Sequence, residues 1–213
     1  MRCTCLFRSL LIALLLYIPS STAAADDSGW NSLFNGRDLT GWKQRNGTAV
    51  YKVEDGTIVG TTTQGSPNSF LCTERDYGNF ELEFDVKLDT QLNSGVQIRS
   101  LSTPEYQNGR VHGYQAEIST DGNAGFVYDE ARRGWLSKDR NNAQAKAAFK
   151  DGQWNHYRVI CQGDSIKTWV NGVPVADLTD SMTKSGFIGL QVHSVGGDPH
   201  WQVRWRNLRL KEL

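Results

Sequence analysis

The sequence predicts an all-β protein built as a two-sheet antiparallel sandwich, and three observations favour this fold class. Apolar and charged residues alternate strictly over residues 80–88, so that one face of this strand packs and the other meets water. An Asn171-Gly172 pair separates two β-rich runs, which is typical of a tight hairpin because both central residues must accept positive φ. Glycine, 21 residues in all, is spread along a chain without internal repeats, as short strands joined by turns require.

Alternating or β-rich runs predict strands from residue 51 to the end of the chain. In order, the expected strands are 51–59, 80–88, 95–99, 114–119, 125–128, 155–161, 165–170, 173–175, 187–194 and 201–210. Pro174 cannot donate to a ladder, so the strand that contains it is expected at an edge. The alanine-rich run 142–149 predicts one short helix on a loop.

The first residues have the order of a secretory signal peptide. Arg2 and Arg8 flank the start of an apolar run, 10–18, and small residues follow up to Ala25. The run is shorter than the roughly 20 residues that a membrane-spanning helix needs. We therefore expect a signal peptide at 1–25, a single β-sandwich domain at 26–213 without a stable membrane span, and export to the periplasm or the cell exterior.

Charge and cysteine content narrow the classes of partner. Lysine and arginine together number 23 and so do aspartate and glutamate, with no basic block that would follow a phosphate backbone, so nucleic acid is not expected as a partner. Cys72 and Cys161 remain after the signal peptide, at a spacing that fits no metal motif. In an exported chain they form either one disulfide or two buried thiols.

Three of the predicted strands carry an unusual polar face. Because side chains repeat every second residue, each polar pair shares a face. The pairs are Gln97 with Arg99, Gln115 with Glu117, and Gln191 with His193. Amides and arginine donate directional hydrogen bonds to sugar hydroxyls, while Glu117 and His193 can exchange protons near neutral pH. The alternative is an ordinary solvent-exposed sheet face.

A second cluster of candidate binding residues lies in the run 125–136. Tyr128 and Trp135 are suited to pack against the apolar face of a sugar ring, and Glu130 and Arg133 to bond its hydroxyls. The alternative is a loop held by its own ion pairs, with Trp135 in the core. The alternate carboxylates of 81–85 do not indicate a glucanase site, because Lys87 continues the alternation and marks a solvated face.

Several blocks of the sequence, in order along nearly the whole chain after the signal peptide, resemble the 3-keto-disaccharide hydrolase domain family. They lie at 33–42, 53–60, 71–80, 93–96, 113–118, 154–155, 189–191 and 206–210. The resemblance implies a jelly-roll sandwich of the concanavalin A-like lectin/glucanase type. Family motifs often read Gly-Tyr-Glu-x-Gln, whereas here Gln115 and Glu117 exchange those places.

The resemblance implies a hydrolase or lyase that cleaves 3-keto-glycosides, with carbohydrate as its partner. Such an enzyme needs a base, an acid and a group that stabilises an enolate. We assign the proton transfers to Glu117 or His193 and the enolate to Arg99, which a divalent metal ion could replace. The alternatives are a non-catalytic, lectin-like carbohydrate-binding module and a conventional glycosidase. Convergence of Glu117 and His193 in one cleft distinguishes the enzyme from the module.

Overall fold

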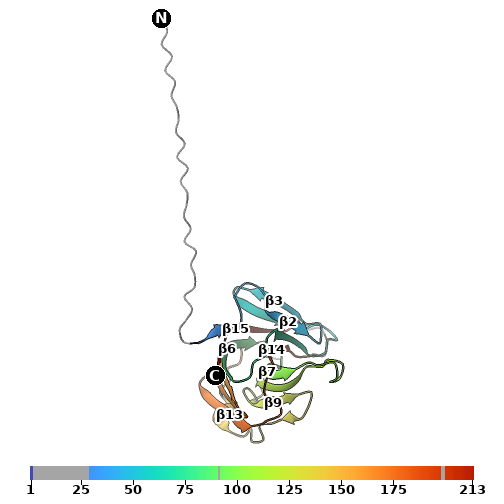
Figure 1. Cartoon of the computed structure of the whole chain (residues 1–213), viewed down its shortest axis with the longest axis vertical. Coiled ribbons are helices and arrows are strands. Elements are labelled where there is room, and N and C mark those ends of the chain that lie inside the picture. The colour runs from blue at the N-terminus through green and yellow to red at the C-terminus, as the bar shows by residue number, and fades with distance from the viewer. Residues whose placement is uncertain (2–28, 91, 198–199) are drawn as a thin grey trace.

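The computed structural model describes Met1 and residues 29–90, 92–197 and 200–213. Two antiparallel sheets stack face to face, as the sequence predicted (Figure 1). Apart from Met1, the predicted signal peptide lies outside the described residues, and export therefore stays a prediction. In the part of the chain that the structure describes, no helix is long and apolar enough to cross a membrane.

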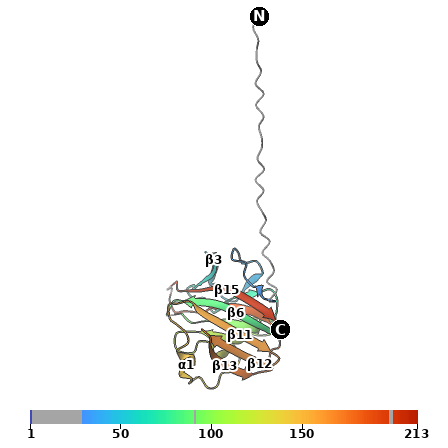
Figure 2. The same cartoon turned by 90° about the vertical axis from the view of Figure 1, so that its left-hand side faces the viewer.

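The first sheet has the order β13-β12-β11-β6-β15-β4-β3, and β1 also pairs with β15 (Figure 2). Its strands are β1 (Asn31–Ser32), β3 (Val50–Glu54), β4 (Thr57–Thr61), β6 (Phe80–Leu88), β11 (Asn155–Gln162), β12 (Ser165–Val170), β13 (Val173–Thr179) and β15 (Gln202–Glu212). As predicted, β6 buries every second residue, and its outward carboxylates pair with basic side chains of β11 and β15. This outer face is therefore a solvated ion-pair surface.

The second sheet has the order β10-β9-β8-β7-β14-β5-β2. Its strands are β2 (Trp42–Arg45), β5 (Ser69–Thr73), β7 (Ser94–Leu101), β8 (His112–Ile118), β9 (Val127–Glu130), β10 (Gly134–Trp135) and β14 (Phe187–Val192). The inward side chains of both sheets form one apolar core, in which the rings of Phe84 and Tyr157 stack 5.0 Å apart. The outward face of this second sheet carries most of the polar side chains singled out above, with Arg99 as the exception described below.

Tight turns set several strand boundaries. Asn171 and Gly172, with φ of 50° and 79°, join β12 to β13, which lies at the edge of its sheet as Pro174 predicted. The prediction of a single strand at 51–59 is wrong. Asp55 and Gly56 adopt φ of 46° and 70° and split it into the hairpin β3–β4. The helix α1 (Ala143–Lys146) is shorter than predicted and is capped by the side chain of Asn142.

Cys72 and Cys161, the cysteines among the described residues, are free, buried thiols that lie in different layers. Cys161 belongs to the core between the sheets. Cys72 lies in a small cluster with Phe70, Val111 and Phe187. Of the two alternatives left open by the sequence, the structure has two thiols.

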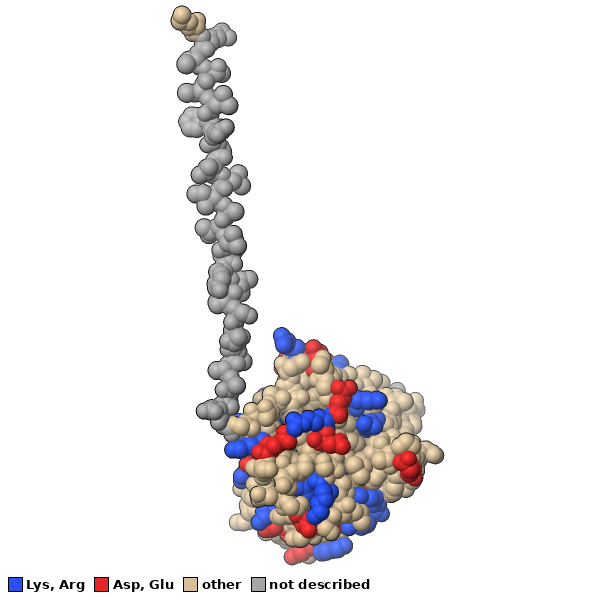
Figure 3. Space-filling view, viewed as in Figure 1, with Lys and Arg blue, Asp and Glu red and all other residues tan. Residues whose placement is uncertain are grey.

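Acidic and basic side chains are interspersed over the surface of the molecule that faces the viewer in Figure 3. The balanced charge of the chain is therefore also balanced locally on this face.

Candidate functional site

Strand register aligns the predicted polar residues across the second sheet. Gln97 of β7 lies opposite Gln115 of β8, Gln115 opposite Tyr128 of β9, and Tyr128 opposite Trp135 of β10. Glu117 belongs to the next row on the same face, because it lies two residues along β8 from Gln115. The amides, the carboxylate and the aromatic rings therefore come from four adjacent strands.

This face of the sheet is hollow. Glu130 of β9 and Gln191 of β14 are separated by β8 and β7, about 14 Å in a flat sheet. Their side chains nevertheless approach to 3.5 Å between Glu130 Oε2 and Gln191 Nε2. Two cavities occupy the hollow and share the three residues Asn68, Glu130 and His193. They form one cleft.

The first cavity, of about 220 Å³, contains the proton-transfer candidates. Its lining consists of Asn68, Asn93, Gln115, Glu117, Tyr128, Glu130, Trp135 and His193. Glu117 and His193 thus converge in one cleft, which is the arrangement that distinguishes the enzyme from the binding module. We call this cavity the Glu117 cavity.

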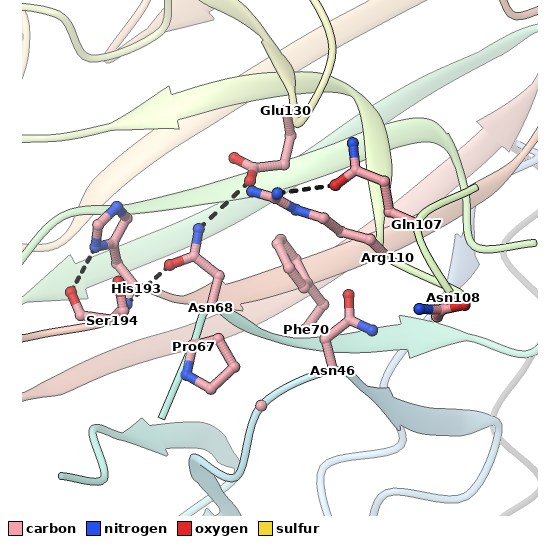
Figure 4. Close-up of a pocket in the computed structure, with 11 residues that line it drawn as sticks. Asn46, Pro67, Asn68, Phe70, Gln107, Asn108, Arg110, Glu130, His193 and Ser194 are labelled. Carbon is pink, nitrogen blue, oxygen red and sulfur yellow. Dashed lines mark hydrogen bonds between the residues drawn. The ribbon is translucent and has the colours of Figure 1, made fainter. Parts of the chain in front are cut away.

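The second cavity, of about 570 Å³, adjoins it (Figure 4). Its lining consists of Asn46, Gly47, Pro67, Asn68, Phe70, Gln107, Asn108, Arg110, Glu130, His193 and Ser194. Figure 4 shows Arg110 reaching over Phe70 toward Glu130. We call this cavity the Arg110 cavity.

A chain of hydrogen bonds runs through the buried amides to Glu117. Ser100 Oγ donates to Gln97 Oε1 over 2.7 Å, and Gln97 Nε2 donates to Gln115 Oε1 over 2.5 Å. Gln115 Nε2 then donates to Glu117 Oε2 over 2.8 Å. Gln97 is fully buried, so it orients Gln115 and does not line the cleft. The chain fixes the carboxylate in one orientation.

Burial sets the protonation of Glu117. The side chain is 5 % exposed, and this desolvation raises the pKa of the carboxyl group to about 7. Hydrogen bonds from Asn93 Nδ2, over 2.5 Å, and from Gln115 oppose the rise because they favour the charged form. A carboxyl group with this pKa both accepts and returns a proton near neutral pH.

Glu130 lies where the two cavities meet and is held less tightly. Asn68 Nδ2 donates to Glu130 Oε1 over 3.4 Å, and the bond from Gln191 is 3.5 Å long. Burial raises the pKa of Glu130, while the positive charge of Arg110 lowers it. Glu130 therefore has a weaker hold on its negative charge than an exposed glutamate has.

His193 follows the end of β14, and one of its ring nitrogens contacts the backbone of the next residue. Its Nδ1 lies 2.7 Å from the carbonyl oxygen of Ser194. Because a carbonyl only accepts, Nδ1 carries the proton and Nε2 is the atom that can receive another. Asn68 fixes this segment, since its Oδ1 accepts from the Ser194 backbone N–H over 2.9 Å.

Tyr128 and Trp135 form an aromatic wall of the Glu117 cavity. Their rings lie 5.1 Å apart in an edge-to-face arrangement. The guanidinium of Arg140 lies 4.3 Å from the centre of the Trp135 ring and supports it. Trp135 is therefore a lining residue of the cleft, as predicted, and not part of the core.

The prediction that Arg99 shares the face of Gln97 is wrong. The pairing of β7 shifts after Ile98, and Arg99 has a φ of 47°, so its side chain leaves the alternation. Its guanidinium donates to Gly78 O over 2.6 Å and to Gly163 O over 2.8 Å, and it also bonds Asn79. Arg99 is fully buried away from the cleft and cannot reach an enolate there.

Arg133 and Gln191 also lie outside the cleft lining. Arg133 pairs with the buried Asp129 and, over 2.9 Å, with Asp180, so it matches the alternative of a loop held by its own ion pairs. Gln191 is fully buried behind Glu130, and its Oε1 accepts no hydrogen bond. Both residues position neighbours and do not face a ligand.

Several lining residues were not predicted. Asn68 and Asn93 precede β5 and β7, and Arg110 precedes β8, so all three lie outside the alternating runs that drew attention. Asn93 begins one of the blocks that resemble the family, which was the one available signal. Among the described residues, no group of three or more His, Cys, Asp or Glu side chains is placed to hold a metal ion.

Comparison with protein families decides the relationship. The 3-keto-alpha-glucoside-1,2-lyase-like domain family matches residues 29–211. The chain belongs to this family. The resemblance noted in the sequence is thus confirmed, and membership associates the protein with carbohydrate chemistry. A search of curated proteins gave no match.

Solved structures confirm the fold class. A candidate glycosyl hydrolase from Parabacteroides distasonis is 24% identical, with 87% of this chain and 94% of that chain covered at a TM-score of 0.62. The carbohydrate-binding module CBM66 from Bacillus subtilis is 18% identical, with 81% and 96% covered at a TM-score of 0.52. A Bacillus subtilis protein with a galectin-like fold is 10% identical, with 82% and 90% covered at a TM-score of 0.53. At these identities the likeness is one of fold.

Proposed function

We propose that the protein cleaves the glycosidic bond of 3-keto-glycosides by base-assisted elimination and hydration. The observation that carries the proposal is Glu117, a buried carboxyl group with a pKa of about 7, held by two amide donors in a cleft that His193 also lines. A protein that only binds sugar needs no such pair. Family membership supports the same reaction class.

The proposed reaction balances without a redox partner. A ketone at C3 acidifies the hydrogen on C2, and a base removes it to leave an enolate. The enolate expels the oxygen at C1, which takes a proton and departs as the leaving alcohol, and an enone remains. Water then adds at C1 of the enone and returns hydrogen to C2, so that one water is consumed for each bond cleaved.

The residues of the cleft divide this work. Glu117 in its charged form removes the C2 proton, and its amide partners hold the accepting oxygen in place. His193, with a second proton on Nε2, gives that proton to the departing oxygen and takes one back from the water that adds at C1. With Arg99 elsewhere, the hydroxyl of Tyr128 stabilises the enolate; a divalent cation, for which the described residues form no group of three ligands, would supply the same positive charge if one bound. Trp135 packs against the sugar ring.

The test measures monosaccharide released from 3-keto-trehalose and 3-keto-lactose, with the parent disaccharides beside them and with and without a chelator. Release from the keto sugars alone is expected. Glu117→Gln keeps the shape and one hydrogen bond but removes the base, so release should fall at least about a hundredfold. Unchanged turnover in this variant would contradict the role of Glu117. Loss of activity with chelator would assign the enolate to a cation.

A second candidate function is a non-catalytic carbohydrate-binding module. The aromatic wall of Tyr128 and Trp135 beside the amides favours it, because stacking and amide hydrogen bonds suffice for a lectin. Sugar binding seen by calorimetry, without release from any substrate, would establish this function. Release from the parent disaccharides would instead indicate a conventional glycosidase that uses Glu117 and Glu130.

A further inference from the structure

The Arg110 cavity is not used by the proposed reaction, although it opens directly onto the residues that carry it. Asn68, Glu130 and His193 belong to both cavities. A substrate whose keto ring occupies the Glu117 cavity would therefore have its scissile bond near Glu130 and His193. Whatever is attached to C1 would extend into the Arg110 cavity, whose volume of about 570 Å³ exceeds that of the Glu117 cavity.

Arg110 is an exposed cation that forms no salt bridge among the described residues, although its charge lowers the pKa of the nearby Glu130. No Asp or Glu oxygen lies within 4.0 Å of its guanidinium among the described residues, and its hydrogen bond from Nη1 goes to the neutral amide of Gln107 over 3.0 Å. Arginines of the opposite sheet differ, since Arg158 and Arg209 both pair with glutamates. The fork of Arg110 is thus available for an anion.

A second cation lies beside the same cavity. Arg45 is opposite Phe70 in the β2–β5 ladder and directly precedes Asn46, which lines the cavity. Its guanidinium lies 5.4 Å from the centre of the Phe187 ring, and its buried Nε donates to no partner. Phe70 and Phe187 belong to one apolar cluster, so both arginines border the same apolar floor.

The carboxylate of Glu130 carries the negative charge that opposes Arg110, and its surroundings stabilise that charge only weakly. Burial raises the pKa of its carboxyl group, and its two amide donors lie at 3.4 and 3.5 Å, near the limit of a hydrogen bond. Arg110 therefore lines the cavity beside a weakly held carboxylate, which leaves its guanidinium donors open to a stronger anion.

We propose that the Arg110 cavity is the leaving-group subsite and that Arg110 selects leaving groups that carry an anion, either a carboxylate or a phosphate. The assignment of this cavity to the leaving group rests on the proposed function. The binding of an anion by Arg110 does not depend on turnover. Arg110 is a specificity residue in this proposal, and no step of bond cleavage uses it.

The experiment compares three 3-keto-glucosides that differ in one substituent of a phenolic leaving group, namely 4-carboxylate, 4-phosphate and the neutral 4-carboxamide. The carboxamide copies the shape of the carboxylate without its charge. We expect kcat/KM to be at least about tenfold higher for an anionic substrate, as a charge-assisted hydrogen bond provides. Whether the carboxylate or the phosphate leads tells which anion the site prefers.

Variants connect the preference to the cavity. Arg110→Gln should lower the ratio of anionic to carboxamide kcat/KM by about tenfold, while Arg110→Lys should retain part of it. Arg37→Gln removes the same charge from an exposed loop residue and should leave the ratio unchanged. Equal losses for charged and neutral substrates in Arg110→Gln, or the absence of any preference in the native protein, would overturn the proposal.

Calorimetry with free 4-hydroxybenzoate and 4-hydroxyphenyl phosphate separates this inference from the proposed reaction. Binding that Arg110→Gln weakens about tenfold, in a protein that cleaves none of the three glucosides, would keep the anion site and refute the lyase function. Cleavage of all three glucosides at equal rates, without binding of either free anion, would instead keep the lyase function and refute the anion site. Thermal melting of each variant confirms that the fold is retained.

Discussion

Two opposing effects set the pKa of Glu117. Burial under the loop and strand residues of the cleft raises it, and the donors Asn93 and Gln115 lower it. Because burial is the larger effect, the native protein holds a carboxyl group that is costly to ionise. This cost has consequences for stability that are separate from any role in catalysis.

Substituting Glu117 by glutamine should stabilise the protein at alkaline pH. The pKa of Glu117 rises from 4.5 to about 7 on folding, so the folded state binds more protons between these values and loses stability as pH increases through them. At one pKa unit per 1.36 kcal/mol, the effect is on the order of 3 kcal/mol. The difference in unfolding free energy between Glu117→Gln and the native protein should grow by that amount between pH 4 and pH 9.

Urea unfolding at the two pH values measures this difference. Glu54→Gln, at an exposed glutamate of β3, is the matched control for the loss of one carboxylate. If the difference in unfolding free energy between Glu117→Gln and the native protein were the same at pH 4 and pH 9, burial would not raise the pKa of Glu117.

Removing one amide donor should move the titration of Glu117 upward. Asn93 Nδ2 donates to Glu117 Oε1 over 2.5 Å and favours the charged form. In Asn93→Ala the midpoint of the rising limb of the kcat/KM profile should therefore lie above its native position near pH 7, and activity at pH 7 should fall several-fold. Asn35→Ala serves as control, because it removes a hydrogen bond that a side-chain amide donates to the carboxylate of Asp38 on a distant loop.

The outcome that would contradict this prediction is a lower rate with an unmoved midpoint. Such a result would assign Asn93 to ligand binding, because loss of a contact to substrate changes the rate without changing the protonation of the base.

Residue-level prediction from the sequence succeeded where alternation continued and failed where the backbone departed from it. Gln115, Glu117 and Tyr128 lie on the predicted face. Arg99 does not, because a positive φ in a bulge reverses its direction, and nothing in the residue types of 95–99 signals that turn.

At the scale of elements, the pairing of β7 with β8 leaves room for the amide chain. Gly95 lies opposite Glu117 in this ladder, and on the other side of β7 it lies opposite Gln191. A Cβ atom at Gly95 would lie 2.3 Å from Cδ of Gln115. The glycine thus makes the space over which Gln115 reaches Glu117.

Gly95→Ala should impair function more than stability. The methyl group would displace the flexible Gln115 side chain, which then loses its bonds to Gln97 and Glu117. We expect kcat/KM to fall about tenfold or more through misplacement of the base, with a loss of stability of about 1–3 kcal/mol. Gly196→Ala, where a Cβ would meet no atom within 4 Å, is the control. A fully active Gly95→Ala would show that the amide chain does not position Glu117.

Element boundaries were predicted best where a strand has one wet and one dry face. The observed β6 has the predicted limits, and β11 extends the predicted strand by one residue. The strand β5 was missed because it is buried along its whole length and shows no alternation, and β2, which is only four residues long, was missed as well. Since Asn46 directly follows β2, and Asn68 and Phe70 lie just before and in β5, this side of the Arg110 cavity could not be predicted either.

At the scale of the whole molecule, the outer faces of the two sheets differ in the polar groups that they carry. On the outer face of the first sheet, charged side chains of β6, β11 and β15 form ion pairs with one another. The outer face of the second sheet instead buries neutral amides around the carboxyl groups of Glu117 and Glu130. Local patterns predicted the two packed sheets, and the resemblance to a family added the jelly-roll type of the sandwich.

The same layering predicts that no disulfide between Cys72 and Cys161 stabilises the protein. Cys161 lies in the core between the sheets, whereas Cys72 lies in the cluster on the far side of the second sheet, so that layer separates the two sulfur atoms. Burial raises the pKa of both thiols, to about 12 for Cys161, which keeps them protonated and unreactive. A reductant should leave the Tm unchanged, and a thiol reagent should label both cysteines in denaturant and neither in the native state. A Tm lowered by reductant would require a disulfide, and hence a different packing of the two sheets.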